Sequence, residues 1–133
     1  MKFYIASKLE NNKQVKRLAS ILARFGWEHT YDWTIHGAGK ELDIKALKAV
    51  GQKESEGVRN ADIVIILSPQ GRGTHVELGM ALALQKIIYI CHADEKYFQC
   101  DDNTSAFYWL PNVHHFIGNI DELAKKMHVE QDL

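Results

Sequence analysis

The chain lacks most features that mark secreted, membrane or nucleic-acid-binding proteins. Its 133 residues contain only two cysteines, Cys91 and Cys100, which is too few for a disulfide framework. The longest apolar run is far shorter than the roughly 20 residues that span a bilayer, and the N-terminus has no signal-peptide pattern. The formal net charge is -1, with acids and bases mixed along the chain, so no basic surface is expected. We therefore expect a cytoplasmic protein whose partners include neither nucleic acid nor membrane.

The spacing of apolar residues predicts strands that alternate with helices. Strands are expected over residues 2–6, 27–31, 63–67, 87–90 and 113–117, and helices from a cap at Asn11 or Asn12 to Phe25 and over 41–60, 74–85 and 120–128. Two of the strands are wholly apolar, which is typical of parallel strands buried on both faces. Such alternation gives parallel βαβ units with right-handed crossovers. We expect one α/β domain over residues 1–133, a three-layer flavodoxin-like sandwich with a five-stranded parallel sheet in the order 2-1-3-4-5.

A ligand of such a sheet binds where the strand order reverses, outside the carboxyl ends of the strands. Here the reversal lies between the first and third strands. The predicted crevice therefore runs from Ser7 to the segment 71–77. Gly71 and Gly73 allow the backbone to approach a ligand closely, because neither carries a Cβ.

Glu77 follows this loop and has two interpretations. The spacing Thr74-x-x-Glu77 before an apolar run is a capping box, in which both side chains only satisfy backbone amides. Alternatively, Glu77 is a nucleophile. A carboxylate in a first helical turn is kept ionised by the helix dipole. An ionised carboxylate at a crevice is what a glycosyl-transferring enzyme requires.

Glu54 interrupts the apolar stripe of the helix predicted over residues 41–60. The stripe advances by three and four residues through Ile44, Leu47, Gly51, Glu54 and Val58. A carboxyl group on a stripe that packs against the sheet should have a raised pKa and hold a proton. The alternative is that Glu54 lies at the helix edge, reaches water and pairs with Lys53 or Arg59. An ionised glutamate beside a proton-holding one is the pairing that cleaves glycosidic bonds.

Two tryptophans and several possible metal ligands carry less specific patterns. Trp33 follows the second predicted strand at the ligand end of the sheet, where it either stacks on a base or belongs to a lid or interface. Trp109 is interpreted as an interface or core residue. The cysteines and histidines match no standard zinc spacing, so no metal site is expected.

Three segments together resemble the nucleoside 2-deoxyribosyltransferase family. They are Phe3-Tyr4-Ile5-Ala6-Ser7, Glu54-x-x-Gly57-Val58-x-x-Ala61-Asp62-Ile63-Val64 and Gly73-Thr74-His75-Val76-Glu77-Leu78-Gly79. The resemblance extends over residues 2–107 and is strongest over 61–84. The same superfamily contains deoxynucleoside 5′-monophosphate N-hydrolases and pyrimidine-nucleotide N-glycosidases. The resemblance implies a flavodoxin-like fold, a nucleoside or nucleotide substrate, and no cofactor.

The resemblance also implies roles for particular side chains. Glu77 matches the catalytic glutamate, and Tyr4 matches the tyrosine that hydrogen-bonds it. Glu54 matches the acidic partner, which is usually Asp in the family. Ser7 and Ser105 match serines that bind the 5′-phosphate in the N-hydrolases, the second of them from a neighbouring subunit. The active unit is therefore expected to be a homodimer or a higher homo-oligomer with a shared active site.

The chain also departs from the family pattern. The arginine that follows the first strand in the N-hydrolases is absent, and Lys8 or Arg72 is expected to take its place at a phosphate. Gly71 stands where the transferases often carry an aspartate. The other residues expected to contact the substrate are Trp33, Gly71, Gly73 and Thr74.

Together these features predict a retaining double displacement at C1′ of a (deoxy)ribonucleoside or its 5′-monophosphate. Glu77 attacks, protonated Glu54 assists departure of the base, and Tyr4 orients Glu77. The deoxyribosyl group then passes to another nucleobase in a transferase or to water in an N-hydrolase. A non-catalytic nucleotide-binding module is a third possibility, although it would not need two carboxyl groups beside C1′. A receiver-type domain is disfavoured because it needs an acidic cluster where this chain has Ala6-Ser7.

Overall fold

The strands form one parallel sheet with the predicted order. The computed structural model describes residues 1–36 and 43–131. In this part of the chain the strands pair in parallel in the order β2-β1-β3-β4-β5. They are β1 (Lys2–Ala6), β2 (Glu28–His29), β3 (Ile63–Leu67), β4 (Ile87–His92) and β5 (Val113–Ile117). The expected α/β fold and its strand order are confirmed.

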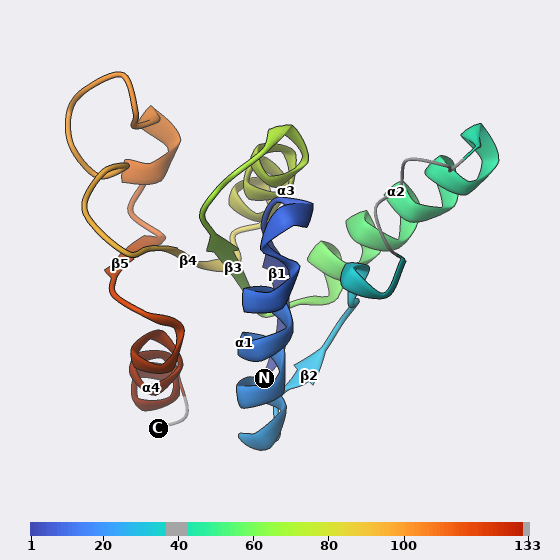
Figure 1. The fold of residues 1–133 in the computed structure, drawn as a ribbon, viewed down its shortest axis with the longest axis horizontal. Coiled ribbons are helices and arrows are strands. Elements are labelled where there is room, and N and C mark those ends of the chain that lie inside the picture. The colour runs from blue at the N-terminus through green and yellow to red at the C-terminus, as the bar shows by residue number, and fades with distance from the viewer. Residues whose placement is uncertain (37–42, 132–133) are drawn as a thin grey trace.

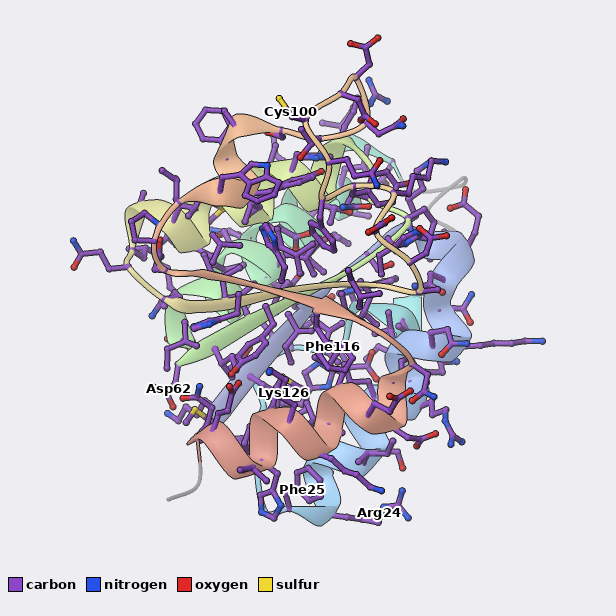
Figure 2. The ribbon with its side chains drawn as sticks, turned by 90° about the vertical axis from the view of Figure 1, so that its left-hand side faces the viewer. Arg24, Phe25, Asp62, Cys100, Phe116 and Lys126 are labelled. Atoms are coloured by element: carbon purple, nitrogen blue, oxygen red, sulfur yellow. The ribbon has the colours of Figure 1, made fainter. Side chains whose placement is uncertain are left out.

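Helices cover both faces of the sheet, and each face has its own core. The helices are α1 (Asn12–Arg24), α2 (Ile44–Asn60), α3 (Arg72–Ala83) and α4 (Ile120–Gln131). Figure 2 shows the sheet nearly edge-on, with α1 and α4 below it and α3 above it. Successive strand residues point to opposite faces. Phe3 and Ile5 therefore pack towards α1 and α4, whereas Tyr4 and Ala6 pack towards α2 and α3.

The first half of α2 does not pack against the sheet. The helix begins at Ile44. Asp43 is its N-cap residue, and the Asp43 carboxylate accepts a hydrogen bond from the Ala46 amide at 2.8 Å. Residues 41–42 of the predicted helix lie outside the described residues. Ile44 is 69% exposed and Leu47 is 48% exposed, and Figure 1 shows this half of α2 extending beyond the sheet. The predicted core-facing stripe is therefore wrong for Ile44 and Leu47, and only the last turns of the helix are buried.

The length of α2 accounts for this difference. A helix of 17 residues is about 25 Å long. A strand of five residues such as β1 is only about 17 Å long. The helix is longer than the surface it covers, so an apolar stripe continues past the end of that surface.

The helix α3 begins two residues earlier than predicted. Gly71 is its N-cap residue, and the Gly71 amide donates a hydrogen bond to Thr74 Oγ1 at 3.1 Å. Glu77 consequently lies in the second turn, so the interpretation of Thr74 and Glu77 as a capping box is wrong. The helix ends at Ala83, shortly before Gln85, whose φ of 56° is left-handed.

The other predicted boundaries differ by a few residues. β2 is shorter than the strand predicted over 27–31, and β4 and α4 continue to His92 and Gln131. A short 3-10 helix, η2 (Trp33–His36), follows β2, and another, η1 (Leu9–Asn11), precedes α1. These differences leave the order of the elements unchanged.

The segment 93–112 connects β4 to β5 and contains a 3-10 helix, η3 (Ala106–Trp109). Tyr108 is its buried anchor and packs into the core on the α2 and α3 face. The Tyr108 hydroxyl hydrogen-bonds His75 Nε2 at 2.7 Å, and His75 Nδ1 lies 2.9 Å from the Gly71 carbonyl oxygen. Cys100 stands exposed at the outer end of this segment (Figure 2), whereas Cys91 is buried, and both are free thiols. The segment is thus fastened to the first turn of α3.

Neither a membrane span nor a metal cluster is found in the described part of the chain. None of the helices there combines the length and apolar character needed to cross a bilayer. Residues 1–36 and 43–131 also contain no group of three or more His, Cys, Asp or Glu side chains placed to hold a metal ion.

Candidate active site

Tyr4 and Glu77 form the buried centre of the site. Tyr4 is fully buried in β1, and its hydroxyl donates a hydrogen bond to Glu77 Oε2. Glu77 projects from the second turn of α3 and is only 8% exposed. A buried carboxyl group needs such a partner, because an unpaired charge in the interior is costly. The contact joins β1 to α3, the helix that follows β3.

Glu54 reaches the same centre from α2. A hydrogen bond between the two carboxyl groups and the charge of Glu54 both raise the pKa of Glu77. Burial is the largest cause that raises the pKa of Tyr4 and of Tyr31, and the charge of Glu54 adds to both shifts. Glu54 is half-buried, so it is neither within the core nor free in solvent. Carboxyl groups in direct contact lack the wide separation that inverting glycosidases leave for a water molecule.

Gly57 lets α2 approach closely enough for this contact. A Cβ added at Gly57 would lie 2.9 Å from the Cδ2 and Cε2 atoms of Tyr4 and 3.0 Å from the Cβ of Tyr31. These distances are shorter than carbon atoms tolerate. Gly57 lies about one turn after Glu54 on α2. The absence of a side chain at Gly57 therefore allows Tyr4 to pass beneath α2 towards Glu77.

The protonation of the pair differs from the prediction for Glu77. Burial raises its pKa to about 8, the hydrogen bond from Tyr4 opposes this rise, and Glu54 adds to it. The expectation that a first-turn position keeps Glu77 ionised is wrong, because Glu77 lies deeper in the helix and is desolvated. Burial, followed by the charge of Glu77, raises the pKa of the Tyr4 hydroxyl well above its usual value. Burial therefore favours the protonated form of Glu77 near neutral pH.

Ser7 is committed to contacts within the chain. Its hydroxyl donates to the Leu67 carbonyl oxygen at 2.8 Å and accepts from Asn11 Nδ2 at 3.0 Å. The Lys8 amide donates to the Pro69 carbonyl oxygen at 3.1 Å. These bonds tie the loop after β1 to the loop after β3. Ser7 would have to exchange its bond to Leu67 in order to donate to a phosphate.

Lys8 and the start of α3 form an open, cationic surface beside this tie. The Lys8 side chain packs over Gly71, where an added Cβ would lie 3.2 Å from Lys8 Cγ. Arg72 is exposed, and a Cβ at Gly73 would meet nothing within 4 Å. No salt bridge holds Lys8 or Arg72 within the described residues. Free amides at a helix N-terminus together with two cations suit an anion.

Three residues predicted to contact the substrate also make contacts within the chain. Thr74 is buried and caps α3. Trp33 is half-buried between the two cores, and its Nε1 donates to the Ile5 carbonyl oxygen at 2.7 Å. Ser105 Oγ accepts a hydrogen bond from the Phe107 amide at 3.3 Å and begins η3. Within the described residues, no hydrogen bond joins Ser105 to the carboxyl pair of its own chain.

Sequence reasoning missed Tyr31 and Asn11. Tyr31 follows β2 and contacts the cluster near Glu54 and Gly57. Nothing in the local pattern marks Tyr31, because its role depends on which helix crosses above it. Asn11 donates to both Ser7 Oγ and the Ser68 carbonyl oxygen, at 3.0 and 3.1 Å. It had been considered only as a helix cap, and it makes no side-chain cap bond.

Comparison with known proteins identifies the family. A parallel α/β sandwich with two contacting carboxyl groups beside the reversal of strand order is the arrangement of an enzyme that cleaves a glycosidic bond. Residues 3–131 match the model of the nucleoside 2-deoxyribosyltransferase family, and the chain belongs to this family of enzymes that cleave N-glycosidic bonds. A solved structure with the same fold is the Clostridium botulinum CMP N-glycosidase BcmB, at 21% identity and a TM-score of 0.65 over 100% of both chains. No curated protein matches the sequence.

Proposed function

We propose that the chain cleaves the N-glycosidic bond of a deoxyribonucleoside or its 5′-monophosphate through a glycosyl-Glu77 intermediate and transfers the sugar to another nucleobase. The observation that carries this proposal is the buried contact of Glu77 with both Tyr4 and Glu54. A helix cap requires neither partner. A retaining mechanism requires a nucleophile, a proton donor and close carboxyl groups.

In the first step, a carboxylate oxygen of Glu77 attacks C1′ while the bond from C1′ to the base nitrogen breaks. The electron pair leaves with the base, which takes the proton held by Glu54. The reactive form of the pair therefore carries one proton, located on Glu54. The Tyr4 hydroxyl favours this form because its hydrogen bond lowers the pKa of Glu77.

In the second step, the acceptor attacks C1′ from the face that the base has left. The ester bond to Glu77 breaks, and Glu54 takes a proton from the acceptor. A second base as acceptor gives transfer, and water gives hydrolysis. Two inversions at C1′ give retention in both cases.

Hydrolysis of a nucleoside 5′-monophosphate is the second candidate function. The open cationic surface of Lys8, Arg72 and the first amides of α3 favours it, because a 5′-phosphate can bind there. The fold neighbour from Clostridium botulinum is described as a CMP N-glycosidase. Such a substrate would explain cations beside a site whose other groups are carboxyl groups.

We also propose that a second copy of the chain completes the site. Apolar side chains are exposed on the first half of α2, and on η3, where Phe107 is 62% and Trp109 is 52% exposed. Apolar patches of this kind mark interfaces. Ser105 borders the η3 patch, so a partner seated there could receive Ser105 or contribute its own.

Chromatography of the products tests the function. The protein is incubated with deoxynucleosides and with their 5′-monophosphates, each with and without a second base. Release of base without an acceptor identifies a hydrolase, and exchange that requires an acceptor identifies a transferase. In either case Glu77→Gln is expected to lower kcat by about 10⁴-fold or more, because the nucleophile is lost.

Circular dichroism of Glu77→Gln controls for loss of the fold. Full activity of a folded Glu77→Gln variant would contradict the mechanism. If the wild-type protein binds these nucleotides but releases and exchanges no base, it is a binding module.

A further inference from the structure

A cavity lies on the face of the sheet opposite the carboxyl pair. It has a volume of about 330 Å³ and sits at the carboxyl ends of β3 and β4, between the starts of α1 and α4. Its apolar walls include Leu67, Cys91 and Ile120, which belong to the core on the α1 and α4 face. Tyr4 belongs to the other core. The sheet therefore separates this cavity from the candidate active site, and none of the mechanistic steps uses it.

The side chains that line the cavity in the described part of the chain are almost all uncharged. None of the described residues that line it is Lys, Arg, Asp or Glu. The imidazole of His92 contacts Asp94 Oδ1 at 3.2 Å, so any positive charge on His92 is already balanced. The dipoles of α1 and α4 favour an anion between their starts, but no Lys or Arg among the described lining residues adds to that attraction.

Neutral hydrogen-bonding groups surround the apolar walls. Asn11 uses its amide hydrogens within the chain and leaves its carbonyl oxygen as an acceptor. Asn119 accepts from the Glu122 amide at 2.9 Å and leaves its amide hydrogens as donors. Gln14 stands at the rim with both halves of its side-chain amide available. The lining of the cavity thus offers both donors and acceptors.

Ser68 adds a further acceptor at the base of the cavity. Its hydroxyl contacts His92 Nδ1. When His92 carries its hydrogen on Nε2, facing Asp94, Nδ1 accepts the Ser68 hydrogen. The lone pairs of Ser68 then remain available to a ligand.

We propose that this cavity binds a neutral free nucleobase. Apolar walls suit the faces of a flat ring, and side-chain amides such as those of asparagine and glutamine suit the mixed donors and acceptors at a base edge. The volume is at the small end of the range for ligand pockets, as a single heterocycle requires. The choice of a nucleobase rests on the proposed function, because a base is the group that this reaction releases, but binding requires no turnover.

The test is an NMR titration of the isotope-labelled, full-length protein with free cytosine, uracil and adenine, without any nucleoside. Inorganic phosphate serves as the charged comparator. A base is expected to shift the side-chain amide signals of Gln14 and Asn119 in a saturable manner, and phosphate is expected to leave them unchanged.

Two variants locate the site. Gln14→Leu removes one amide, and Asn119→Asp keeps the acceptor that caps α4 while removing the donor. Each is expected to weaken binding about threefold to tenfold, as the loss of one hydrogen bond predicts. Gln52→Leu, on the exposed surface of α2, is the matched control and should bind as the wild type does.

The proposal is overturned if bases shift only signals around Tyr4 and Glu77, if phosphate shifts the cavity signals and bases do not, or if both variants bind bases normally. A protein that binds bases at Gln14 but shows no turnover would support the cavity and contradict the proposed function. Turnover without binding of a base at the cavity would support the proposed function and contradict the cavity proposal.

Discussion

The two halves of α2 have the same apolar periodicity but different surroundings. The second half rests on Tyr4, where Gly57 and Val58 are buried and Glu54 meets Glu77. The first half extends past the sheet with Ile44 and Leu47 exposed. Periodicity shows which side chains share a face, but it does not show what covers that face. One helix can thus serve a reaction at one end and present an interface at the other.

The largest expected difference between the halves is catalytic. Glu54→Gln removes the proton donor and is expected to lower kcat by about 10²- to 10⁴-fold. Glu56→Gln, two residues along the same helix and exposed, is expected to leave kcat unchanged. Steady-state kinetics on the substrate found by chromatography measures both. Equal activity of the two variants would remove Glu54 from the mechanism.

The pH dependence of stability probes the carboxyl pair beneath the packed half. Because the pKa of Glu77 is raised in the folded state, its contribution to stability is fully present below its unfolded pKa and is lost as the pH rises through about 8. Glu77→Gln cannot ionise, so it should gain stability relative to the wild type between about pH 5 and pH 8. Urea unfolding across this range measures the difference. A constant difference would mean that Glu77 titrates normally.

A pair of glycine substitutions compares the packing of the two halves. Gly57→Ala places a Cβ 2.9 Å from the Tyr4 ring and is expected to destabilise the fold by about 1–3 kcal/mol. Gly51→Ala meets nothing within 4 Å and should stabilise the helix by about 0.5–1 kcal/mol. Thermal unfolding should therefore shift in opposite directions. Shifts of the same sign would show that the described packing of α2 on Tyr4 is incorrect.

The smallest expected effect on stability is in the first half of α2. Leu47→Glu should change the stability of a single chain by no more than about 0.5 kcal/mol, because Leu47 is largely exposed there. The same change should dissociate an oligomer that uses this surface. Sedimentation velocity measures the dissociation, with Lys48→Glu as a charge control. An oligomer that tolerates Leu47→Glu would place its interface elsewhere.

The strand order of the sheet could be predicted because it depends on patterns within short segments of the sequence. Wholly apolar runs at β3 and β4 and regular alternation with helices were enough for the strand order. The start of α3 was misplaced, because Gly71 competes with Thr74 as the cap and only the fold decides between them. The exposed half of α2 was missed for a similar reason, since its pattern is that of a buried helix.

Within the site, the residues were easier to predict than their protonation and their contacts. The glycine loop and the interrupted apolar stripe made Glu77 and Glu54 candidates, and the family resemblance added Tyr4. The structure brings these three side chains together. The raised pKa of Glu77 depends on burial between β1 and α3, which no short motif encodes. Tyr31 and Asn11 act through partners far away in the sequence. Their contacts could therefore not be inferred from spacing.

The tie between the loops that follow β1 and β3 determines how a substrate can enter and leave. Ser7, Lys8 and Asn11 donate hydrogen bonds to the carbonyl oxygens of Leu67, Pro69 and Ser68, respectively. These bonds hold the two loops together at the carboxyl ends of β1 and β3. Separating the two loops would break several hydrogen bonds at once, so we expect their relative position to stay fixed. We therefore expect substrate and product to pass beside α2 and not between these two loops. The rate of product release would then depend on how freely the outer half of α2 moves.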